Sequence, residues 1–182
     1  MLILLPPSEK KSLLPGPAIT VYTGVLYQGL GWATLNKSAQ NRAQKSIAII
    51  SAKYGIVRPL DLIEPYKEKI DPAKMRGPIT HKLENIETDL IVDCRSSTYQ
   101  SVWTPLAMKS VEIKIFTHVD GVKKVITHMS KKTRGEVTRL LLLSTTVPTN
   151  PHELRDIVAA NFDCELIEAS GKKPWVLEVI AQ

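Results

Sequence analysis

Three short apolar runs, each followed at once by polar residues, limit the folds that this chain can adopt. The runs are Leu2–Leu5, Ile47–Ile50 and Leu90–Val92. Runs of this length are typical of buried strands, and they are too short to cross a membrane. The sequence therefore predicts a sheet with buried central strands and no membrane-spanning helix.

Segments with helical spacing lie between these runs. The clearest helix start is at Asn150, because Pro151 and Glu153 follow at the positions where a helix favours proline and glutamate. Ser130 is a second candidate N-cap. Helices are therefore predicted from Asn150 onward and over residues 35–45, 73–87 and 130–145.

Alternating apolar and polar residues predict further strands in the second half of the chain. One covers residues 111–116, with residues 122–127 as its candidate partner, and residues 164–168 and 175–180 flank a Gly-Lys-Lys-Pro turn. Buried strands that alternate with helices and end in a hairpin are typical of an α/β protein with a mixed sheet. We expect residues 1–182 to form one such α/β (mixed α+β) domain.

Positive charge is concentrated in two stretches. The net charge is +6, from 24 Lys and Arg against 18 Asp and Glu, and the sequence pI is near 9.3. Residues 1–80 carry 11 basic and 5 acidic side chains, and residues 111–140 carry 7 and 3. Such basic blocks favour a polyanion as partner, although a high pI alone is common among unrelated proteins.

The richest polar loop follows the second apolar run. It begins at Ser51 and holds Arg58, Asp61 and Tyr66, with prolines that stiffen it. In open sheets ligands bind beyond the carboxyl ends of the strands, and a stiff loop loses little entropy when a ligand orders it. Two interpretations stay open: a ligand site, or a surface connection in which Arg58 and Asp61 pair with each other.

A second polar segment starts the helix predicted from Ser130. Lys131 and Lys132 would lie in its first turn, where the helix dipole disfavours cations, and Gly135 would weaken its interior. An anion bound there by both lysines and Arg134 would explain these choices, with Gly135 letting that anion, or another backbone, come close. The alternative is an ordinary solvated basic face.

Two further loops leave the first and third apolar runs. Ser8, Glu9 and Lys11 follow the first, and Ser96 and Tyr99 follow the third. The S-x-x-K spacing of Ser8 and Lys11 occurs in some acyl enzymes, but the other motifs of those enzymes are missing, so the match is ascribed to chance. We expect these side chains to face one shared cleft at the strand ends.

Metal, thiol and nucleotide motifs are missing from the sequence. The four histidines have no ligand spacing, and no glycine-rich phosphate loop occurs. Cys94 and Cys164 lie far apart without a CxxC motif, as expected of ordinary thiols in a reducing cytoplasm. We predict no metal, no cofactor and a cytoplasmic location.

Five blocks, in this order, resemble the YaaA family of peroxide stress proteins. They are Leu2–Lys11 (LILLPPSEKK), Tyr22–Tyr27 (YTGVLY), Ser51–Tyr66 (SAKYGIVRPLDLIEPY), Val92–Tyr99 (VDCRSSTY) and Lys131–Gly135 (KKTRG). The third block is long and specific, and the resemblance covers nearly the whole chain. The PPSE start and the Trp175–Ile180 ending look most like a shorter, actinobacterial-type branch.

The resemblance implies a YaaA-like fold, protection against peroxide damage, and DNA binding with a helix-hairpin-helix element. Longer members carry a helical segment before the Y-x-G motif, whereas Lys11 and Tyr22 are close here, so this chain lacks that hairpin if the segment supplies it. Cys94 stands where members show Leu, which argues against a peroxidatic thiol. By position, the family motifs fall on Lys11, Arg58, Pro59, Asp61, Pro65, Tyr66, Ser96, Tyr99, Lys131, Arg134 and Gly135.

Two functions follow as hypotheses. The first is a monomeric stress protein that binds double-stranded DNA through a basic cleft, and the second is an enzyme that acts there on a nucleotide, nucleoside or nucleic-acid base, with a phosphate or nucleotide ligand. A binder spreads its cations over an exposed face, whereas an enzyme gathers them in a pocket. The predicted phosphate contacts are Lys11, Arg58, Lys131, Lys132 and Arg134. The predicted lining is Ser8, Glu9, Tyr22, Ser51, Asp61, Tyr66, Ser96, Tyr99 and Gly135.

Overall fold

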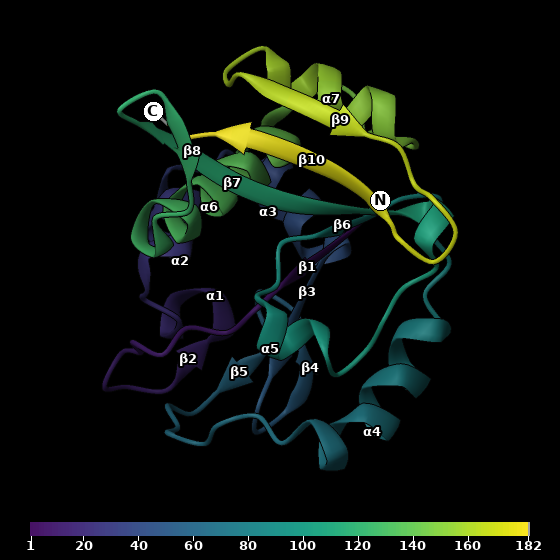
Figure 1. Ribbon diagram of the computed structural model, residues 1–182. Helices are drawn as coiled ribbons and strands as arrows, with labels where there is room; N and C mark the ends of the chain where they lie inside the picture. The colour runs from purple at the N-terminus through teal and green to yellow at the C-terminus, as the bar shows by residue number, and fades with distance from the viewer. Residues whose placement is uncertain (182) are drawn as a thin grey trace.

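A mixed β-sheet runs through the molecule (Figure 1), as a computed structural model that describes residues 1–181 shows. The strands of this sheet are β1 (Leu2–Leu5), β3 (Ile47–Ser51), β4 (Gly55–Val57), β6 (Ile91–Asp93), β7 (Ser110–Val119), β8 (Val122–Lys124), β9 (Cys164–Ile167) and β10 (Trp175–Ile180). Their order is β4-β3-β1-β6-β7-β10-β9, and β8 pairs with the end of β7. The predicted α/β fold with a mixed sheet is confirmed.

The five middle strands of the sheet run parallel to their neighbours, whereas β4, β8 and β9 are antiparallel to theirs. A two-stranded sheet of β2 (Gly16–Pro17) and β5 (Leu62–Ile63) lies beside it. Because the middle strands are parallel, their carboxyl ends meet at one edge of the sheet. In Figure 1 this carboxyl edge faces left, where the loop after β1 and the β7–β8 hairpin also lie.

Helices cover both faces of the parallel strands. They are α1 (Ala18–Val21), α2 (Val25–Leu30), α3 (Lys37–Ser46), α4 (Pro72–Glu84), α5 (Ser97–Gln100), α6 (Thr127–Leu143) and α7 (Pro151–Ala159), with 3₁₀ turns at Trp32–Thr34 and Ala107–Lys109. No helix of residues 1–181 is long and apolar enough to span a bilayer.

Alternation along β1 explains why its apolar run is continuous. Ile3 and Leu5 point into the core shared with α2, α3, α6 and α7, whereas Leu2 and Leu4 point into a smaller core shared with α4. Successive side chains of a strand face opposite sides of a sheet, so a strand covered on both sides must be apolar throughout. All four residues are buried.

The helix predicted from Ser130 begins earlier, at Thr127, and this corrects the expected role of its lysines. The predicted strand 122–127 ends at Lys124 as β8, which leaves Thr127 free to start α6. The Ser130 hydroxyl donates to the Ile126 carbonyl instead of capping the helix. Lys131 therefore lies in the second turn, where its amide is already used within the helix, and the expected anion site at a helix N-terminus does not form.

Gly135 serves a helix crossing rather than an anion. A Cβ added at Gly135 would overlap the Leu26 carbonyl oxygen of α2, and one added at Gly29 would overlap the Lys132 carbonyl oxygen of α6. Only glycine at both positions allows the two helices to come this close. Of the two partners that the sequence left open for Gly135, it is therefore the other backbone that approaches.

The structure confirms other predicted elements, with small shifts in their bounds. Asn150 caps α7 by accepting hydrogen bonds from two backbone amides, as predicted. The helix expected over 73–87 forms from Pro72 to Glu84, with Asp71 as its N-cap. The terminal hairpin is confirmed as β9 and β10, and β10 also pairs in parallel with β7, which local patterns did not reveal.

Candidate functional site

Three hydroxyl groups meet at the carboxyl edge, just beyond β3. Ser51 ends this strand, and its Oγ donates to the Tyr66 hydroxyl at 2.8 Å, which lies 2.8 Å from the Tyr22 hydroxyl. All three residues are buried, at 0%, 7% and 1% exposure. Residues that lie far apart in sequence thus form one hydrogen-bonded chain, as expected for polar loops at the strand ends.

One end of the chain of hydroxyls has a defined direction. Ser51 Oγ accepts from the amides of Lys53 and Tyr54, so its own hydrogen goes to Tyr66. In the second hydrogen bond, between Tyr66 and Tyr22, either hydroxyl can be the donor. Burial keeps Tyr22 protonated, because it raises the pKa of Tyr22 well above its usual range. Tyr22 therefore takes part in the chain as a neutral hydroxyl.

Lys11 reaches the same place from the loop after β1. It forms an isolated antiparallel bridge with Tyr22, flanked by backbone hydrogen bonds between Ser12 and Val21 and between Thr23 and Lys10. Its ammonium lies 4.2 Å from the centre of the Tyr66 ring and 5.8 Å from that of Tyr22. Burial lowers the pKa of Lys11 more than the nearby Glu68 and Glu9 raise it.

The remaining residues that line this group come from the loops after β1 and β6. Burial raises the pKa of Tyr99 to about 12, and the charges of Tyr66 and Glu9 add smaller contributions in the same direction. Ser8 is buried at 6% exposure beside Gly24, where a Cβ would overlap the Ser8 hydroxyl. Ser96 precedes α5 at the N-cap position, without a side-chain capping bond. We call Ser51, Tyr66, Tyr22, Lys11, Tyr99 and Glu9 the tyrosine cluster.

Arg58 and Asp61 lie elsewhere, so the predicted convergence of that loop on the cluster is wrong for these two residues. Strand β4 runs back along β3, which carries Arg58 to the amino end of the strand. There its guanidinium donates to the Ile47 carbonyl at 2.8 Å, while its amide donates to Asp61 at 2.7 Å. The alternative interpretation was a surface connection in which Arg58 and Asp61 pair with each other. It describes this loop better, because the Arg58 amide donates to the Asp61 carboxylate.

The basic residues of α6 divide into engaged and free groups. Arg134 donates from its Nε to the Ile113 carbonyl of β7 at 3.2 Å, and the exposed Lys132 pairs with Glu136 at 3.1 Å. Lys131 is exposed and has no carboxylate within 4.0 Å among the described residues. Of the predicted phosphate contacts, Lys11 and Lys131 have no carboxylate within 4.0 Å among residues 1–181.

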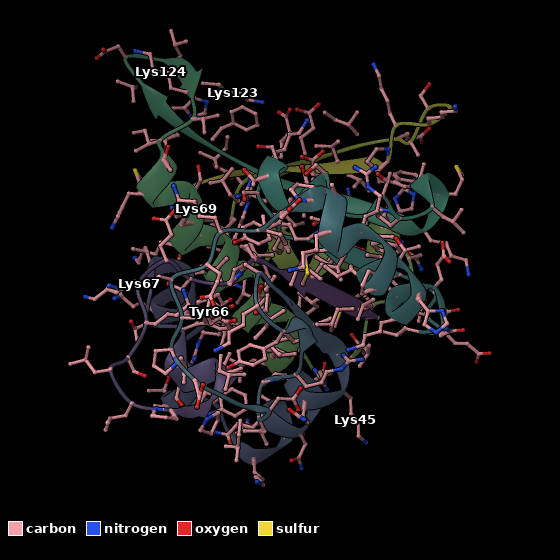
Figure 2. All side chains as sticks on the ribbon, turned by 90° about the horizontal axis from the view of Figure 1, so that it is seen from below. Lys45, Tyr66, Lys67, Lys69, Lys123 and Lys124 are labelled. Atoms are coloured by element: carbon pink, nitrogen blue, oxygen red, sulfur yellow. The ribbon has the colours of Figure 1, made fainter. Side chains whose placement is uncertain are left out.

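Three exposed lysines at the same edge were missed by residue-level reasoning. They are Lys67 and Lys69, which follow Tyr66, and Lys124 at the end of β8. Figure 2 shows them on the left of the molecule, with Lys45 toward the lower right. The two basic blocks of the sequence were the available signal, but net charge over dozens of residues does not locate a surface. We call Lys67, Lys69, Lys124 and Lys131 the lysine edge.

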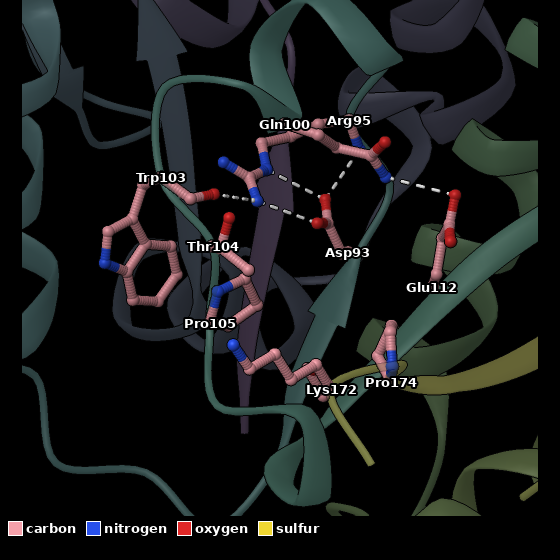
Figure 3. A pocket seen from close by; sticks show the side chains of 10 residues that line it. Asp93, Arg95, Gln100, Trp103, Thr104, Pro105, Glu112, Lys172 and Pro174 are labelled. Atoms are coloured by element: carbon pink, nitrogen blue, oxygen red, sulfur yellow. Dashed lines mark hydrogen bonds and ion pairs between the residues drawn. The ribbon is translucent and has the colours of Figure 1, made fainter. Parts of the chain in front are cut away.

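A separate cavity of about 170 Å³ lies near the end of β6 (Figure 3). Asp93 and Arg95 form a buried ion pair there, with 2.8 Å between carboxylate and guanidinium. Arg95 also donates to the Tyr99 and Trp103 carbonyls, and it is 1% exposed. Lys172, from the β9–β10 turn, also lines the cavity, and it has no carboxylate within 4.0 Å among residues 1–181.

Redox and metal groups are sparse in the part of the chain described. Burial raises the pKa of Cys94 to about 12, and its sulfur lies 3.9 Å from the Thr138 hydroxyl. Such a thiol is a poor nucleophile at neutral pH, because the thiolate is the reactive form. No group of three His, Cys, Asp or Glu residues within 1–181 is arranged to hold a metal ion.

The fold and the edge together define an α/β protein with a polar, partly cationic site beyond the carboxyl ends of parallel strands. A model of the family described as peroxide stress protein YaaA matches residues 7–166. A UPF0246 protein of Streptomyces coelicolor is 32% identical over 179 residues, which cover 90% of this chain and 68% of that protein. The chain belongs to the peroxide stress protein YaaA family.

Other relatives give the same picture. A UPF0246 protein of Corynebacterium efficiens is 34% identical over 178 residues, covering 90% of this chain and 69% of that protein. One from Ruegeria pomeroyi is 25% identical over 181 residues, covering 88% and 69%. The chain is similar to actinobacterial members, as its sequence motifs predicted, and about a third of each relative lies outside the match.

Proposed function

We propose that this chain serves in the peroxide stress response by binding duplex DNA along the lysine edge. The observation that carries the proposal is a set of exposed lysines on three separate segments, of which Figure 2 shows Lys67, Lys69 and Lys124 on one side of the molecule. Lys67 and Lys69 follow Tyr66, Lys124 ends β8 and Lys131 lies on α6, and none has a carboxylate within 4.0 Å among residues 1–181.

Unpaired exposed ammonium groups are suited to a polyanion. Each is free to replace a counterion on a phosphate, and no internal ion pair must break first. Their spread over an exposed face is the pattern expected of a backbone binder rather than of an enzyme pocket. Lys11 adds a half-buried cation within the tyrosine cluster. A cytoplasmic location belongs to the same proposal, because DNA is found there.

A second candidate function is an enzyme that acts on a nucleotide, nucleoside or nucleic-acid base. It is favoured by the buried hydroxyl chain from Ser51 through Tyr66 to Tyr22. Plain binding of a phosphate backbone does not need such a buried chain. The cavity beside Asp93 does not support this candidate, since its arginine is fully engaged.

The test is fluorescence anisotropy of a labelled duplex, titrated at about 50 to 200 mM salt. Wild type is expected to bind with a salt slope of several phosphates. Changing Lys67, Lys69 and Lys131 to Gln together should reduce that slope by nearly three, because each lost phosphate contact contributes about 0.9.

A matched triple variant controls for net charge. Lys45, Lys82 and Lys109 are also exposed and precede the starts of β3, β6 and β7, away from the carboxyl edge. Their change to Gln removes the same charge and should leave the slope near the wild-type value. An equal loss in both variants would contradict the lysine edge, and a wild type that does not bind at low salt would contradict the proposal and favour the second candidate.

A further inference from the structure

The β7–β8 hairpin extends past the end of the sheet as a two-stranded ribbon. The pairing of β10 with β7 ends at Phe116, whereas residues 117–119 pair with β8. Every residue from 120 to 128 is exposed. Figure 2 shows the ribbon projecting from the body of the molecule, where Lys123 and Lys124 are labelled.

We propose that this ribbon, residues 117–124, enters the major groove of duplex DNA and contacts the edges of the bases. The inference rests on the proposed DNA binding and adds a groove contact to it. The major groove of B-DNA is about 12 Å wide and admits a two-stranded β-ribbon, whereas the minor groove is about 6 Å wide. The dimensions of the ribbon therefore select the major groove.

Ion pairs fix the direction in which the ribbon projects. The Lys123 ammonium lies 2.9 Å from the Glu178 carboxylate of β10 and 3.8 Å from that of Glu165 on β9. It also lies 5.7 Å from the centre of the Phe116 ring. An isolated two-stranded hairpin is only marginally stable in water, so these contacts help to hold its shape. A ribbon that is already ordered loses little entropy when it binds.

The two faces of the ribbon differ in their contacts. Successive residues of a strand face opposite sides, so Lys123 shares one face with its pair His118, and Val122 shares the other with Lys124. The ion pairs of Lys123 use the first face. On the second face, Val122 is 57% exposed, and Lys124 has no carboxylate within 4.0 Å among residues 1–181. The second face is therefore available to a ligand.

Exposed apolar side chains gather along this segment. Besides Val122, Val125 and Ile126 are 64% and 37% exposed, in the link from β8 to α6. Single exposed apolar residues are normal on a protein surface, but several in one segment mark an interaction site. A phosphate backbone offers them no apolar partner, whereas the major groove exposes the C5 methyl group of thymine.

The turn of the ribbon carries an acid, which fits a groove better than a backbone. Asp120 and Gly121 join β7 to β8 with positive φ angles of 53° and 76°. Phosphates repel a carboxylate at this tip. In the major groove, a carboxylate accepts a hydrogen bond from N4 of cytosine. Asp120 at the tip and Val122 beside it are thus suited to base edges, and Lys124 is suited to a phosphate.

Three duplexes with the same base order and the same backbone charge test the proposal by anisotropy with the full chain. One is unmodified, one carries glucosylated 5-hydroxymethylcytosine, which obstructs the major groove, and one carries uracil for thymine, which removes only the C5 methyl groups. Wild type is expected to bind the obstructed duplex at least about ten-fold more weakly than the unmodified one. It should prefer thymine over uracil by about four-fold for each methyl group that it covers.

A matched pair of variants assigns the contact to the ribbon. Val122→Ser removes the apolar side chain and should lose most of the preference for thymine, with affinity for the uracil duplex near that of wild type. Val147→Ser is the control, because Val147 is 42% exposed and lies beyond the carboxyl end of α6, so this variant should keep the preference.

A third variant separates groove from backbone at the tip. Asp120→Asn removes a negative charge, so on a phosphate surface it would tighten binding to every duplex alike, and that result would contradict the groove contact. In the groove it should shift the relative affinity from G·C-rich toward A·T-rich duplexes, because asparagine pairs with adenine.

The outcomes separate the two proposals. Equal binding of the three duplexes by wild type would overturn the groove contact and leave DNA binding along the lysine edge intact. A preference for thymine that is absent in wild type, or unchanged in Val122→Ser, would overturn the ribbon as the contacting segment. Absence of binding to any duplex would overturn both proposals. Because the three duplexes are compared on wild type, the groove contact is tested even if a variant fails to fold.

Discussion

The arginine at the cavity beside β6 and the lysines of the lysine edge differ in burial and in pairing. Arg95 is buried and uses its guanidinium on Asp93 and on two backbone carbonyls, whereas Lys67 and Lys131 stand exposed without a carboxylate nearby. A buried cation must be paired because water no longer solvates it. An exposed cation without an ion pair contributes little to the stability of the fold. We infer that Arg95 stabilises the fold and that the edge lysines are available for the ligand that we propose.

The largest expected effect comes from breaking the buried ion pair of Asp93 and Arg95. Arg95→Met leaves the Asp93 carboxylate buried without its partner, so the free energy of unfolding should fall by about 3–5 kcal/mol. Urea unfolding measures this. Lys172→Met, at the same cavity, should change stability by less than about 0.5 kcal/mol. Similar losses in both variants would contradict the contrast.

The next effect concerns the helix that carries Lys131. Gly135→Ala forces α6 away from the Leu26 carbonyl and should cost about 1–3 kcal/mol in thermal unfolding. Gly77→Ala is the control in α4, where a Cβ meets nothing within 4 Å and should gain up to about 1 kcal/mol from helix propensity. If Gly135→Ala were equally harmless, the close crossing of α2 and α6 would be wrong.

Two buried tyrosines, Tyr22 and Tyr27, should make stability depend on alkaline pH. Burial raises the pKa values of Tyr22 and Tyr27 above the usual 10.0. Above pH 10 the unfolded chain therefore loses these protons first, and the free energy of unfolding should fall by at most about 1.4 kcal/mol per pH unit for each. Below pH 10 this contribution is constant. Urea unfolding between pH 8 and 11 checks it, and a flat profile above pH 10 would contradict the burial of these hydroxyls.

The smallest expected effect is a difference in duplex binding between two neighbouring lysines of α6. Lys131 is unpaired, whereas its neighbour Lys132 pairs with Glu136. Lys131→Gln should reduce the salt slope of duplex binding by about 0.9, and Lys132→Gln should reduce it by less. Anisotropy titrations of the two variants measure this difference. A larger reduction for Lys132→Gln would show that pairing is no guide to the binding surface.

Much of the tyrosine cluster could be predicted because it depends on short-range patterns. Ser51 ends an apolar run that can only be a buried strand, and the carboxyl ends of parallel strands meet at one edge. Polar residues beyond those ends, such as Lys11 and Tyr66, therefore had to lie near one another. Their exact partners required the bridge of Lys11 to Tyr22, which joins two loops.

What could not be predicted depends on where the chain turns. Arg58 lies only seven residues after Ser51, but a tight return by β4 takes it to the other end of β3. The early end of β8 moved the start of α6 and changed the role of Lys131. Such turns are set by tertiary pairing, so local spacing does not reveal them.

Lysine footprinting tests the central claim most directly. The chain would be acetylated at low reagent concentration with and without a duplex of about 20 base pairs, and the modified lysines identified by mass spectrometry. We predict protection of Lys67, Lys69, Lys124 and Lys131, with Lys45 and Lys172 unchanged. Protection of Lys45 and Lys172 with the edge lysines still reactive would contradict the assignment of the carboxyl edge as the DNA-binding surface.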